Sequence, residues 1–420
     1  MVDSLLGNGL LTMRIPIRVF VIGQCLQTER SALLQLKRGF TFFKLNTWIP
    51  GTNCCLWESV ICDEWRVIGL DLRGQDIEGT IDPSLFNLTS LCTLDFSYNR
   101  FNGKSIPDSG WDQLANLSRL DLSNSGFVGK VPIGITRLTK LTVINLSFNY
   151  YEFKYLSFTI KPTFLQNMSS LRELYLDNVD LSTYGNEWCS ALINSTMILE
   201  VLSMSGCSLF GFCPKQIFLL RNLRKLDISK NPKLYGSLPN FSVDNNLHFF
   251  VLSYTNFSGK LPDTIGNLKF LRQLDLSSCQ FSGRLPPSMR NLSLLETLDL
   301  SNNNKLQGPI PGSLFQLSRL SLIFLASNNF SEVMELELIK DHKDLFSLDL
   351  SNNALSLSSW KANEGSSPSD YPRLAILALA SCNLTKIPAF LKYHHNIGTL
   401  DLSNNKIHGE IPSWIWNIGN

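Results

Sequence analysis

Apolar residues recur along most of this chain in one short phrase. Leucine or another apolar residue stands at its first, fourth and sixth positions, and most often asparagine at its ninth. Because the fourth and sixth positions lie two residues apart, the phrase predicts a short strand whose two apolar side chains share one face. The fourteen copies, most often 24 residues apart, start at residues 67, 91, 117, 141, 171, 199, 223, 247, 271, 295, 320, 345, 374 and 397.

One such unit cannot bury its own leucines, whereas stacked units form a continuous core. The repeat therefore predicts an α/β repeat solenoid with a parallel β-sheet on its concave side. We expect each asparagine to close the turn after its strand, where the side-chain amide satisfies backbone groups of neighbouring coils. Cysteine takes this position at Cys207, Cys279 and Cys382, and we expect these three thiols to be inert, packed side chains.

A second phrase, Gly-x-apolar-Pro, follows many of the strand phrases, as at Gly259–Pro262 and Gly283–Pro286. Glycine permits a positive-φ turn and proline stops the short strand that follows. The convex side is therefore expected to be mostly non-helical, with short strands and 3₁₀ turns.

Composition excludes some classes of function. The 37 Lys+Arg nearly balance the 35 Asp+Glu, so the net charge of +2 does not favour nucleic-acid binding. No stretch approaches 18 uninterrupted apolar residues, so we expect no transmembrane helix.

Four cysteines, Cys25, Cys54, Cys55 and Cys62, crowd a loop-rich stretch near the start of the chain. This arrangement is typical of a small disulfide-stapled cap in an oxidising compartment. A zinc site is the weaker alternative, because adjacent cysteines have poor ligand spacing and no histidine lies nearby. Within this stretch we expect Thr28 to cap a helix.

Ten Asn-x-Ser/Thr triplets also favour secretion, although an asparagine- and serine-rich repeat produces some by chance. Residues 1–23 resemble only a degraded signal peptide, because their apolar run is interrupted by Arg18. The candidate glycosylation sites are Asn87, Asn116, Asn145, Asn167, Asn194, Asn240, Asn256, Asn291, Asn329 and Asn383.

Together the two phrases and the cysteine-containing start resemble the plant-specific leucine-rich repeat of receptor-like kinases, receptor-like proteins and polygalacturonase inhibitors. This resemblance implies a right-handed leucine-rich-repeat horseshoe. It also implies disulfides that pair Cys25 with Cys54 and Cys55 with Cys62. The segment 122–133 and the Gly185–Cys189 insert further resemble receptor-like proteins of the Verticillium wilt resistance type.

The expected organisation has three parts: a leader at 1–23, a cap at 24–66, and fourteen repeats at 67–420 with insertions near 150–165 and 182–197. The chain ends inside repeat fourteen without a C-terminal capping repeat. Compared with the family it resembles, it is therefore expected to be a truncated ectodomain.

No catalytic, metal-binding or cofactor-binding constellation is present. The histidines His248, His342, His394, His395 and His408 are scattered, and the adjacent pair lacks the helical spacing of a metal site. The aspartates of the repeats are interpreted as a solvated consensus. We therefore expect no enzyme activity.

Binding is the favoured class of function. Positions where an aromatic, apolar or arginine side chain replaces the usual Asp or Ser are candidate contacts. These are Tyr175, Phe249, Val251, Tyr254, Arg272 and Phe324.

The family resemblance implies an extracellular ectodomain of a single-pass type I plasma-membrane protein. Such a receptor senses a protein, peptide or glycan ligand of microbial or apoplastic origin and signals in defence through adaptor and co-receptor kinases. No nucleic-acid partner is expected. The alternative is a soluble inhibitor of a microbial cell-wall hydrolase, similar to the polygalacturonase inhibitors.

Overall fold

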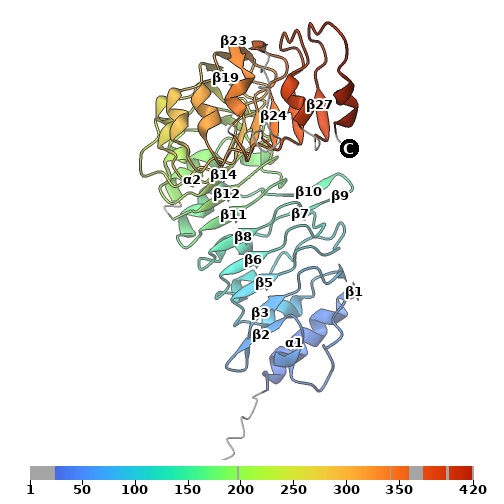
Figure 1. The fold of residues 1–420 in the computed structure, drawn as a ribbon. Coiled ribbons are helices and arrows are strands. Elements are labelled where there is room, and N and C mark those ends of the chain that lie inside the picture. Colours follow the sequence, from blue (N-terminus) through green and yellow to red (C-terminus); the bar gives the residue numbers. More distant parts are fainter. Residues whose placement is uncertain (1–23, 196–197, 341, 359–371, 394–396, 419–420) are drawn as a thin grey trace, which may run out of the picture.

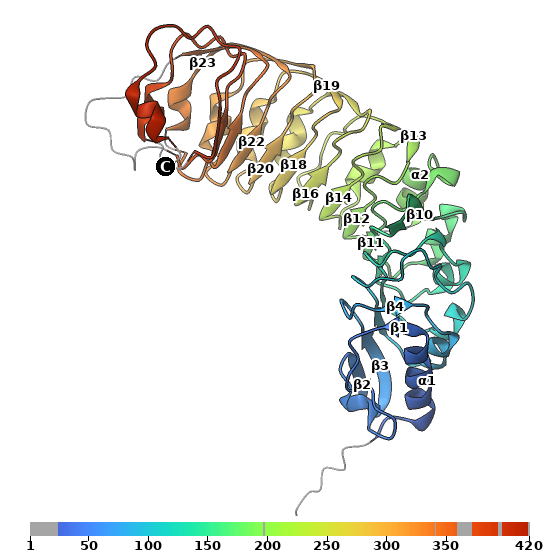
Figure 2. The same ribbon diagram turned by 90° about the vertical axis from the view of Figure 1, so that its right-hand side faces the viewer.

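A computed structural model describes residues 24–195, 198–340, 342–358, 372–393 and 397–418. The chain forms a curved solenoid that advances coil by coil from a cap near the N-terminus (Figures 1 and 2). The expected leader, residues 1–23, lies outside the described residues.

One sheet of fifteen strands lines the inner side of the curve, with the strands in sequence order. Its first pair, β2 (Val60–Asp63) and β3 (Arg66–Asp71), is antiparallel, and every later pair is parallel. The fourteen strands from β3 onward correspond to the fourteen phrases, so the predicted concave parallel sheet is confirmed. The remaining strands are β5 (Thr93–Asp95), β6 (Arg119–Asp121), β8 (Val143–Asn145), β11 (Glu173–Tyr175), β12 (Val201–Ser203), β14 (Lys225–Asp227), β16 (Phe249–Val251), β18 (Gln273–Asp275), β20 (Thr297–Asp299), β22 (Leu322–Phe324), β24 (Ser347–Asp349), β26 (Ile376–Ala378) and β27 (Thr399–Asp401).

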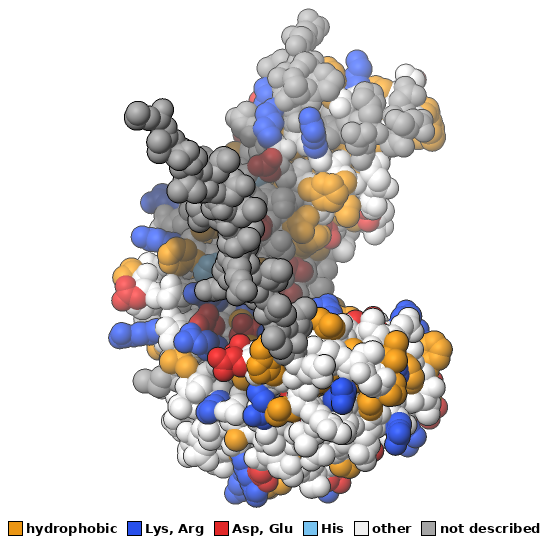
Figure 3. Space-filling model, turned by 90° about the horizontal axis from the view of Figure 1, so that it is seen from below, with side chains coloured by type: hydrophobic (Ala, Val, Ile, Leu, Met, Phe, Trp, Pro, Cys, Tyr) orange, Lys and Arg blue, Asp and Glu red, His pale blue; other side chains and the backbone are white. Residues whose placement is uncertain are grey.

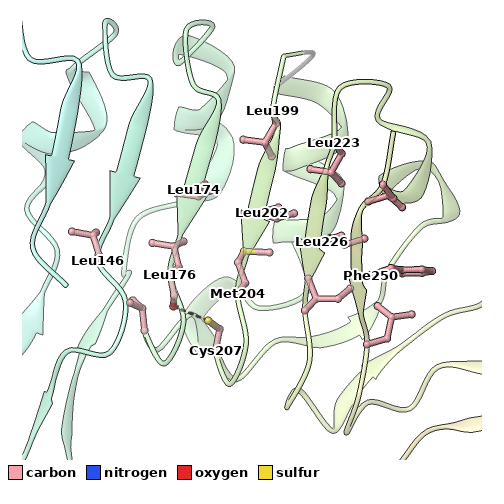
Figure 4. Close-up of a cluster of buried hydrophobic side chains, with 14 of the residues drawn as sticks. Leu146, Leu174, Leu176, Leu199, Leu202, Met204, Cys207, Leu223, Leu226 and Phe250 are labelled. Carbon is pink, nitrogen blue, oxygen red and sulfur yellow. Dashed lines mark hydrogen bonds between the residues drawn. The ribbon is translucent and has the colours of Figure 1, made fainter. Parts of the chain in front are cut away.

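The inward side chains of these strands stack in rows to form the core. Leu174, Leu202, Leu226 and Phe250 stand opposite one another on four consecutive strands, and all four are buried (Figure 4). Each coil covers the apolar residues of the coil before it, so burial depends on neighbours along the solenoid.

An asparagine ladder runs beside this core. The Nδ2 of Asn303 donates to the carbonyl of Leu276 in the preceding coil at 2.8 Å and to Leu300 in its own coil at 3.1 Å. Its Oδ1 accepts from the backbone N–H of Phe281 at 2.9 Å. One amide therefore satisfies backbone groups of two coils, as expected, and the same pattern recurs at Asn99, Asn149, Asn231, Asn328, Asn353 and Asn405.

The cap is built on helix α1 (Gln27–Arg38), whose residues Leu33 and Leu36 are buried. The prediction that Thr28 caps this helix was wrong. The helix begins one residue earlier with Leu26 at its N-cap, which makes no side-chain hydrogen bond. After the helix, strand β1 (Phe40–Phe42) pairs antiparallel with β4 (Glu78–Gly79) of the first repeat and joins the cap to the solenoid.

Short strands and 3₁₀ turns occupy the convex side, as predicted. At five of the positions where the Gly-x-apolar-Pro phrase begins, φ is positive, between 80° and 98°: Gly129, Gly259, Gly283, Gly308 and Gly409. Among the described residues, α2 (Trp188–Ser195) is the one α-helix outside the cap. The strands on this side are β7 (Gly129–Lys130), β13 (Phe210–Phe212), β15 (Lys233–Tyr235), β17 (Ser258–Lys260), β19 (Gln280–Gly283), β21 (Lys305–Gly308), β23 (Asn329–Glu335) and β25 (Ala354–Ser358).

Both expected insertions form structure of their own. The first contains a hairpin of β9 (Tyr150–Tyr151) and β10 (Lys154–Ser157), and β10 also pairs with β7. The second contains α2, which is anchored by the fully buried Trp188 and by a disulfide between Cys189 and Cys213 of the next coil. A disulfide closing a loop of this size stabilises a fold by about 2–4 kcal/mol.

Six cysteines are paired and four are free. The cap disulfides join Cys25 to Cys54 and Cys55 to Cys62, the pairs implied by the family resemblance. The third disulfide, Cys189–Cys213, had no counterpart among the expectations. Cys92, Cys207, Cys279 and Cys382 are free.

The buried thiols take part in the ladder as well as packing in the core. Cys207 Sγ lies 2.9 Å from the carbonyl oxygen of Leu176 in the preceding coil (Figure 4). Burial raises the pKa of the Cys207 and Cys279 thiols, and it raises the pKa of Cys382 to about 12.

Replacing Asn303 by Ala is expected to lower the free energy of unfolding by about 3 kcal/mol, because it leaves buried backbone groups of two coils unpaired. The measurement is the urea midpoint followed by circular dichroism. Asn304→Ala is the matched control, because Asn304 is the adjacent residue and is exposed. Equal urea midpoints for the two variants would show that the hydrogen bonds of Asn303 do not contribute to stability.

Iodoacetamide at pH 8 is expected to leave Cys207, Cys279 and Cys382 unlabelled in the folded protein, because burial and a raised pKa both keep the thiolate scarce. Mass spectrometry should detect all three adducts after unfolding in guanidinium. Partly exposed Cys92 is the internal control and should react first. Labelling of Cys207 at the rate of Cys92 would contradict this expectation.

Candidate ligand-binding face

The outward residues at the end of each concave strand form a single row across the sheet, here called the middle row. Its members are placed opposite one another by the strand register. They are Asp71, Asp95, Asp121, Asn145, Tyr175, Ser203, Asp227, Val251, Asp275, Asp299, Phe324, Asp349, Ala378 and Asp401.

Most aspartates of the middle row have a structural role. Asp299 Oδ1 accepts from the backbone N–H of Ser301 at 2.9 Å and from its hydroxyl at 2.6 Å. The same pair forms between Asp95 and Ser97. Burial, followed by neighbouring aspartates, raises the pKa of both Asp95 and Asp299. The recurring Asp-x-Ser pattern therefore holds the turn after the strands that carry it.

The structure does not bring the six predicted contact residues into one patch. Phe249, Val251, Tyr254 and Arg272 lie in two adjacent repeats, on or beside β16 and β18. Tyr175 on β11 and Phe324 on β22 each lie three strands from β16, about 14 Å at the usual strand spacing. The four residues of β16 and β18 form the centre of the candidate face.

The side chains at this centre differ in exposure. Phe249 is 39% exposed and Tyr254 is 58% exposed, so both rings can contact a ligand. Val251, in contrast, is only 9% exposed between Asp227 and Asp275 on the neighbouring strands. This low exposure leaves Val251 little surface for a contact, and its role as a contact residue stays a prediction.

Tyr175 is a half-buried member of the middle row. Its hydroxyl donates to Glu173 Oε2 at 3.0 Å, and the Lys225 ammonium lies 5.8 Å from its ring centroid. Burial and then the Glu173 carboxylate raise the pKa of Tyr175 to about 12. This side chain is held in place by its neighbours and stays neutral at physiological pH.

The sequence reasoning missed a row of charged residues just before the strands, here called the edge row. Each member follows the first apolar residue of its phrase by one position, and backbone hydrogen bonds of 2.7–2.8 Å link each to the next. A shallow cavity of about 350 Å³ lies along part of this row. The edge row consists of Arg172, Glu200, Arg224, His248, Arg272 and Glu296.

Two ion pairs in the edge row are close. Arg172 and Glu200 approach to 2.7 Å, as do Arg272 and Glu296. Arg224 also faces Glu200, but at 3.7 Å. Of the six predicted contact residues, only Arg272 belongs to this row. The sequence therefore indicated one member of the row but not the row itself.

Candidate glycosylation sites are almost absent from the strands of the concave sheet. Asn145 is the one such site on a concave strand, and it is half-buried. Its Nδ2 donates to Asp121 Oδ2 at 3.0 Å and to Ser123 Oγ at 3.2 Å. The other nine lie outside the concave strands and are exposed: Asn87, Asn116, Asn167, Asn194, Asn240, Asn256, Asn291, Asn329 and Asn383.

The geometry offers little for catalysis. In the described residues, no group of three or more His, Cys, Asp or Glu is placed to hold a metal ion. His248, His342 and His408 lie in separate repeats, while His394 and His395 lie outside the described residues.

Basic, acidic and apolar side chains are interspersed on the face seen in Figure 3. Among the helices described, none is both long and apolar enough for a bilayer span.

Family models match residues of both the cap and the repeats. Residues 26–63 match the family model of the leucine rich repeat N-terminal domain. The leucine rich repeat model matches residues 246–268, 270–292, 294–317 and 396–418.

Curated relatives are plant proteins. Receptor-like protein 6 of Arabidopsis thaliana is 29% identical, with 94% of this chain and 51% of that protein covered. Receptor-like protein 7 of Arabidopsis thaliana is 32% identical, with 94% and 50% covered. Receptor-like protein Cf-9 of Solanum pimpinellifolium is 33% identical over 54% of this chain and 26% of that protein. The chain thus spans about half the length of the first two relatives, and the narrower Verticillium resemblance stays a prediction.

Solved structures agree on the fold. The ectodomain of the Arabidopsis receptor kinase HAESA, in complex with an extended IDA peptide hormone, matches with a TM-score of 0.75 at 28% identity. That match covers 94% of this chain and 68% of the other. A TDR receptor structure matches with a TM-score of 0.61 at 27% identity, covering 84% and 66%.

Glycopeptide mass spectrometry of the chain secreted from plant cells is expected to find glycans at the exposed sites and none at Asn145. A glycan would replace one Nδ2–H of Asn145, break a hydrogen bond to the neighbouring strand and stand on the concave sheet. Asn116, which lies just before the preceding repeat, is the internal control because its side chain is exposed. Occupancy at Asn145 equal to that at Asn116 would refute this expectation.

Proposed function

We propose that this chain, which is similar to the receptor-like proteins of plants and contains leucine-rich repeats, is an extracellular ligand-recognition ectodomain. Its concave sheet binds a peptide or protein ligand of microbial or apoplastic origin in pathogen sensing. Recognition is by surface complementarity and involves no catalysis.

One observation carries this proposal: the departures from the repeat consensus gather on a face that is nearly free of candidate glycosylation sites. Phe249 and Tyr254 are exposed there, and the edge row with its cavity lies beside them. Exposed aromatic and arginine side chains are typical anchors of protein interfaces. The nine exposed sites lie outside the strands of this sheet.

Partners are proposed from the relatives. HAESA has been solved with its peptide hormone and with the co-receptor SERK1. By analogy, the receptor to which this chain corresponds binds its ligand on the solenoid and signals through adaptor and co-receptor kinases. We place it on the extracellular side of the plasma membrane, which fits the disulfide-stapled cap.

Substituting the two exposed aromatics with common residues of the repeat, Phe249→Thr together with Tyr254→Asn, is expected to reduce ligand capture at least 10-fold. Asn suits position 254 because Tyr254 has φ of 55°, which Asn tolerates. The measurement immobilises the secreted chain, passes over it the peptide fraction of leaf extracellular fluid, and quantifies retained peptides by mass spectrometry.

Phe212→Thr with Tyr235→Thr is the matched control, because these two rings are equally exposed but lie on convex strands β13 and β15. Peptides retained by wild type and control but lost from the concave variant support the proposal. Equal retention by all three proteins would refute binding on the concave face. Inhibition of a fungal polygalacturonase by the purified chain would favour the inhibitor alternative instead.

A further inference from the structure

The centre of the edge row holds three adjacent side chains that carry or can carry positive charge. Arg224, His248 and Arg272 follow one another on consecutive strands, with backbone hydrogen bonds of 2.7 and 2.8 Å between them. The acidic members Glu200 and Glu296 lie only at the two ends of this trio. No carboxylate of the edge row therefore separates the three.

Arg224 is the least satisfied cation of the trio. Its nearest described acidic partner is Glu200 at 3.7 Å, and that carboxylate already has Arg172 at 2.7 Å. The Arg224 side chain is 64% exposed, whereas that of Glu200 is 25% exposed. A guanidinium carries five N–H donors, so Arg224 presents donors to the groove beyond the carboxylate that faces it.

The imidazole of His248 is held rigidly between the two arginines. Its Nδ1 lies 2.7 Å from the carbonyl oxygen of Asn246. Its ring stacks on Phe270 with centroids 5.8 Å apart and an interplanar angle of 12°. Arg224, His248, Asn246 and Phe270 line the cavity of about 350 Å³, as do Arg172 and its partner Glu200 at the other end. Arg272 is next in the row, beside the lining residues.

Further basic residues flank the trio in sequence. Arg221 and Lys269 are exposed just before the first apolar residues of their repeats, and Lys225 follows Arg224 on β14, with its ammonium 5.8 Å from the Tyr175 ring centroid. Phe249 follows His248 and is exposed on β16. The trio and its neighbours combine guanidinium donors, an excess of positive charge and aromatic rings, which suits a carboxylate beside an apolar group.

We propose that this groove, here called the arginine groove, binds a carboxylate of an acidic peptide ligand, seated over His248 between Arg224 and Arg272. This inference rests on the proposed function and names the chemistry that the concave face recognises. The two arginines lie two strands apart, about 10 Å. Their guanidinium groups face the outer carboxylates, Arg224 toward Glu200 at 3.7 Å and Arg272 toward Glu296 at 2.7 Å. A ligand carboxylate over His248 therefore competes with these two glutamates for the guanidinium donors. An apolar ligand residue next to the carboxylate contacts Phe249 or Phe270.

A peptide fits this groove better than an acidic polysaccharide. Arg172, Glu200 and Arg224 alternate in sign, and Glu296 follows Arg272. A polyuronide bears a carboxylate on every sugar, so an extended chain would place some of them against Glu200 or Glu296 at a repulsive cost. A peptide with isolated acidic residues can place its carboxylate away from both Glu200 and Glu296.

The test uses two pools of N-acetylated, C-amidated peptides that are identical except for Glu or Gln at one fixed position flanked by Phe. A third pool has the Gln sequence with a free C-terminal carboxylate, and tetragalacturonic acid represents the uronides. Binding to the intact, secreted chain is measured by biolayer interferometry at two salt concentrations. We expect the Glu pool to bind at least 10-fold more tightly than the amidated Gln pool, and more weakly at high salt.

Arg224→Gln and Arg272→Gln are each expected to remove most of this preference. Arg290→Gln makes the same charge change on an exposed residue of the 3₁₀ turn Pro287–Asn291, outside the groove, and should have no effect. If the Gln pool with a free C-terminal carboxylate binds as tightly as the Glu pool, recognition of a carboxylate is supported, and the carboxylate bound is the peptide terminus.

Equal binding of the Glu pool and both Gln pools, or no binding of any, would overturn the inference. So would a preference that survives Arg224→Gln. Binding of tetragalacturonic acid in place of the peptides would assign the groove to a uronide. Each of these results is separable from the proposed function, because concave-face recognition is tested independently by the Phe249 and Tyr254 substitutions with natural peptides.

Discussion

No coil of this protein can satisfy its backbone or bury its leucines alone, and the asparagine ladder is the interaction that makes neighbouring coils inseparable. Each amide donates to carbonyls in two coils and accepts a backbone N–H from the preceding one. A buried backbone group without such a partner costs as much as the hydrogen bond it lacks. Where the amide is replaced, as at Cys207, a hydrogen bond to the preceding coil survives through the thiol.

This constraint divides the residues of a repeat into two kinds. The inward leucines and the ladder residue are fixed by contact with adjacent coils, whereas outward positions that make no turn hydrogen bond face solvent. Segments that leave the repeat need separate anchors. The helix α2 is held by buried Trp188 and by the Cys189–Cys213 disulfide, and the hairpin of β9 and β10 is held by pairing with β7. These anchors let the insertions leave the repeat without disturbing the core.

The sequence was sufficient to predict the sheet, because period and register depend on the same leucines that must be buried. It was sufficient for the burial of Cys207, Cys279 and Cys382 for the same reason. It was insufficient where a residue's environment is made by residues about 24 positions away. Val251 is only 9% exposed between Asp227 and Asp275, and the edge row becomes a continuous surface only when six repeats are stacked. The prediction that Thr28 caps the helix was wrong for a local reason, because the helix begins before this residue.

The Asp–Ser pair limits where specificity can reside on the concave face. An aspartate that accepts two hydrogen bonds from the following serine, such as Asp95 or Asp299, is committed to its own turn. Specific contacts must then come from repeats that lack the pair, and from rows that do not hold the turn. Tyr175, Val251 and Phe324 break the pair at intervals of three strands. The edge row does not hold the turn through such a pair. Its positions can therefore carry ionisable side chains, and this is where such side chains gather on consecutive repeats.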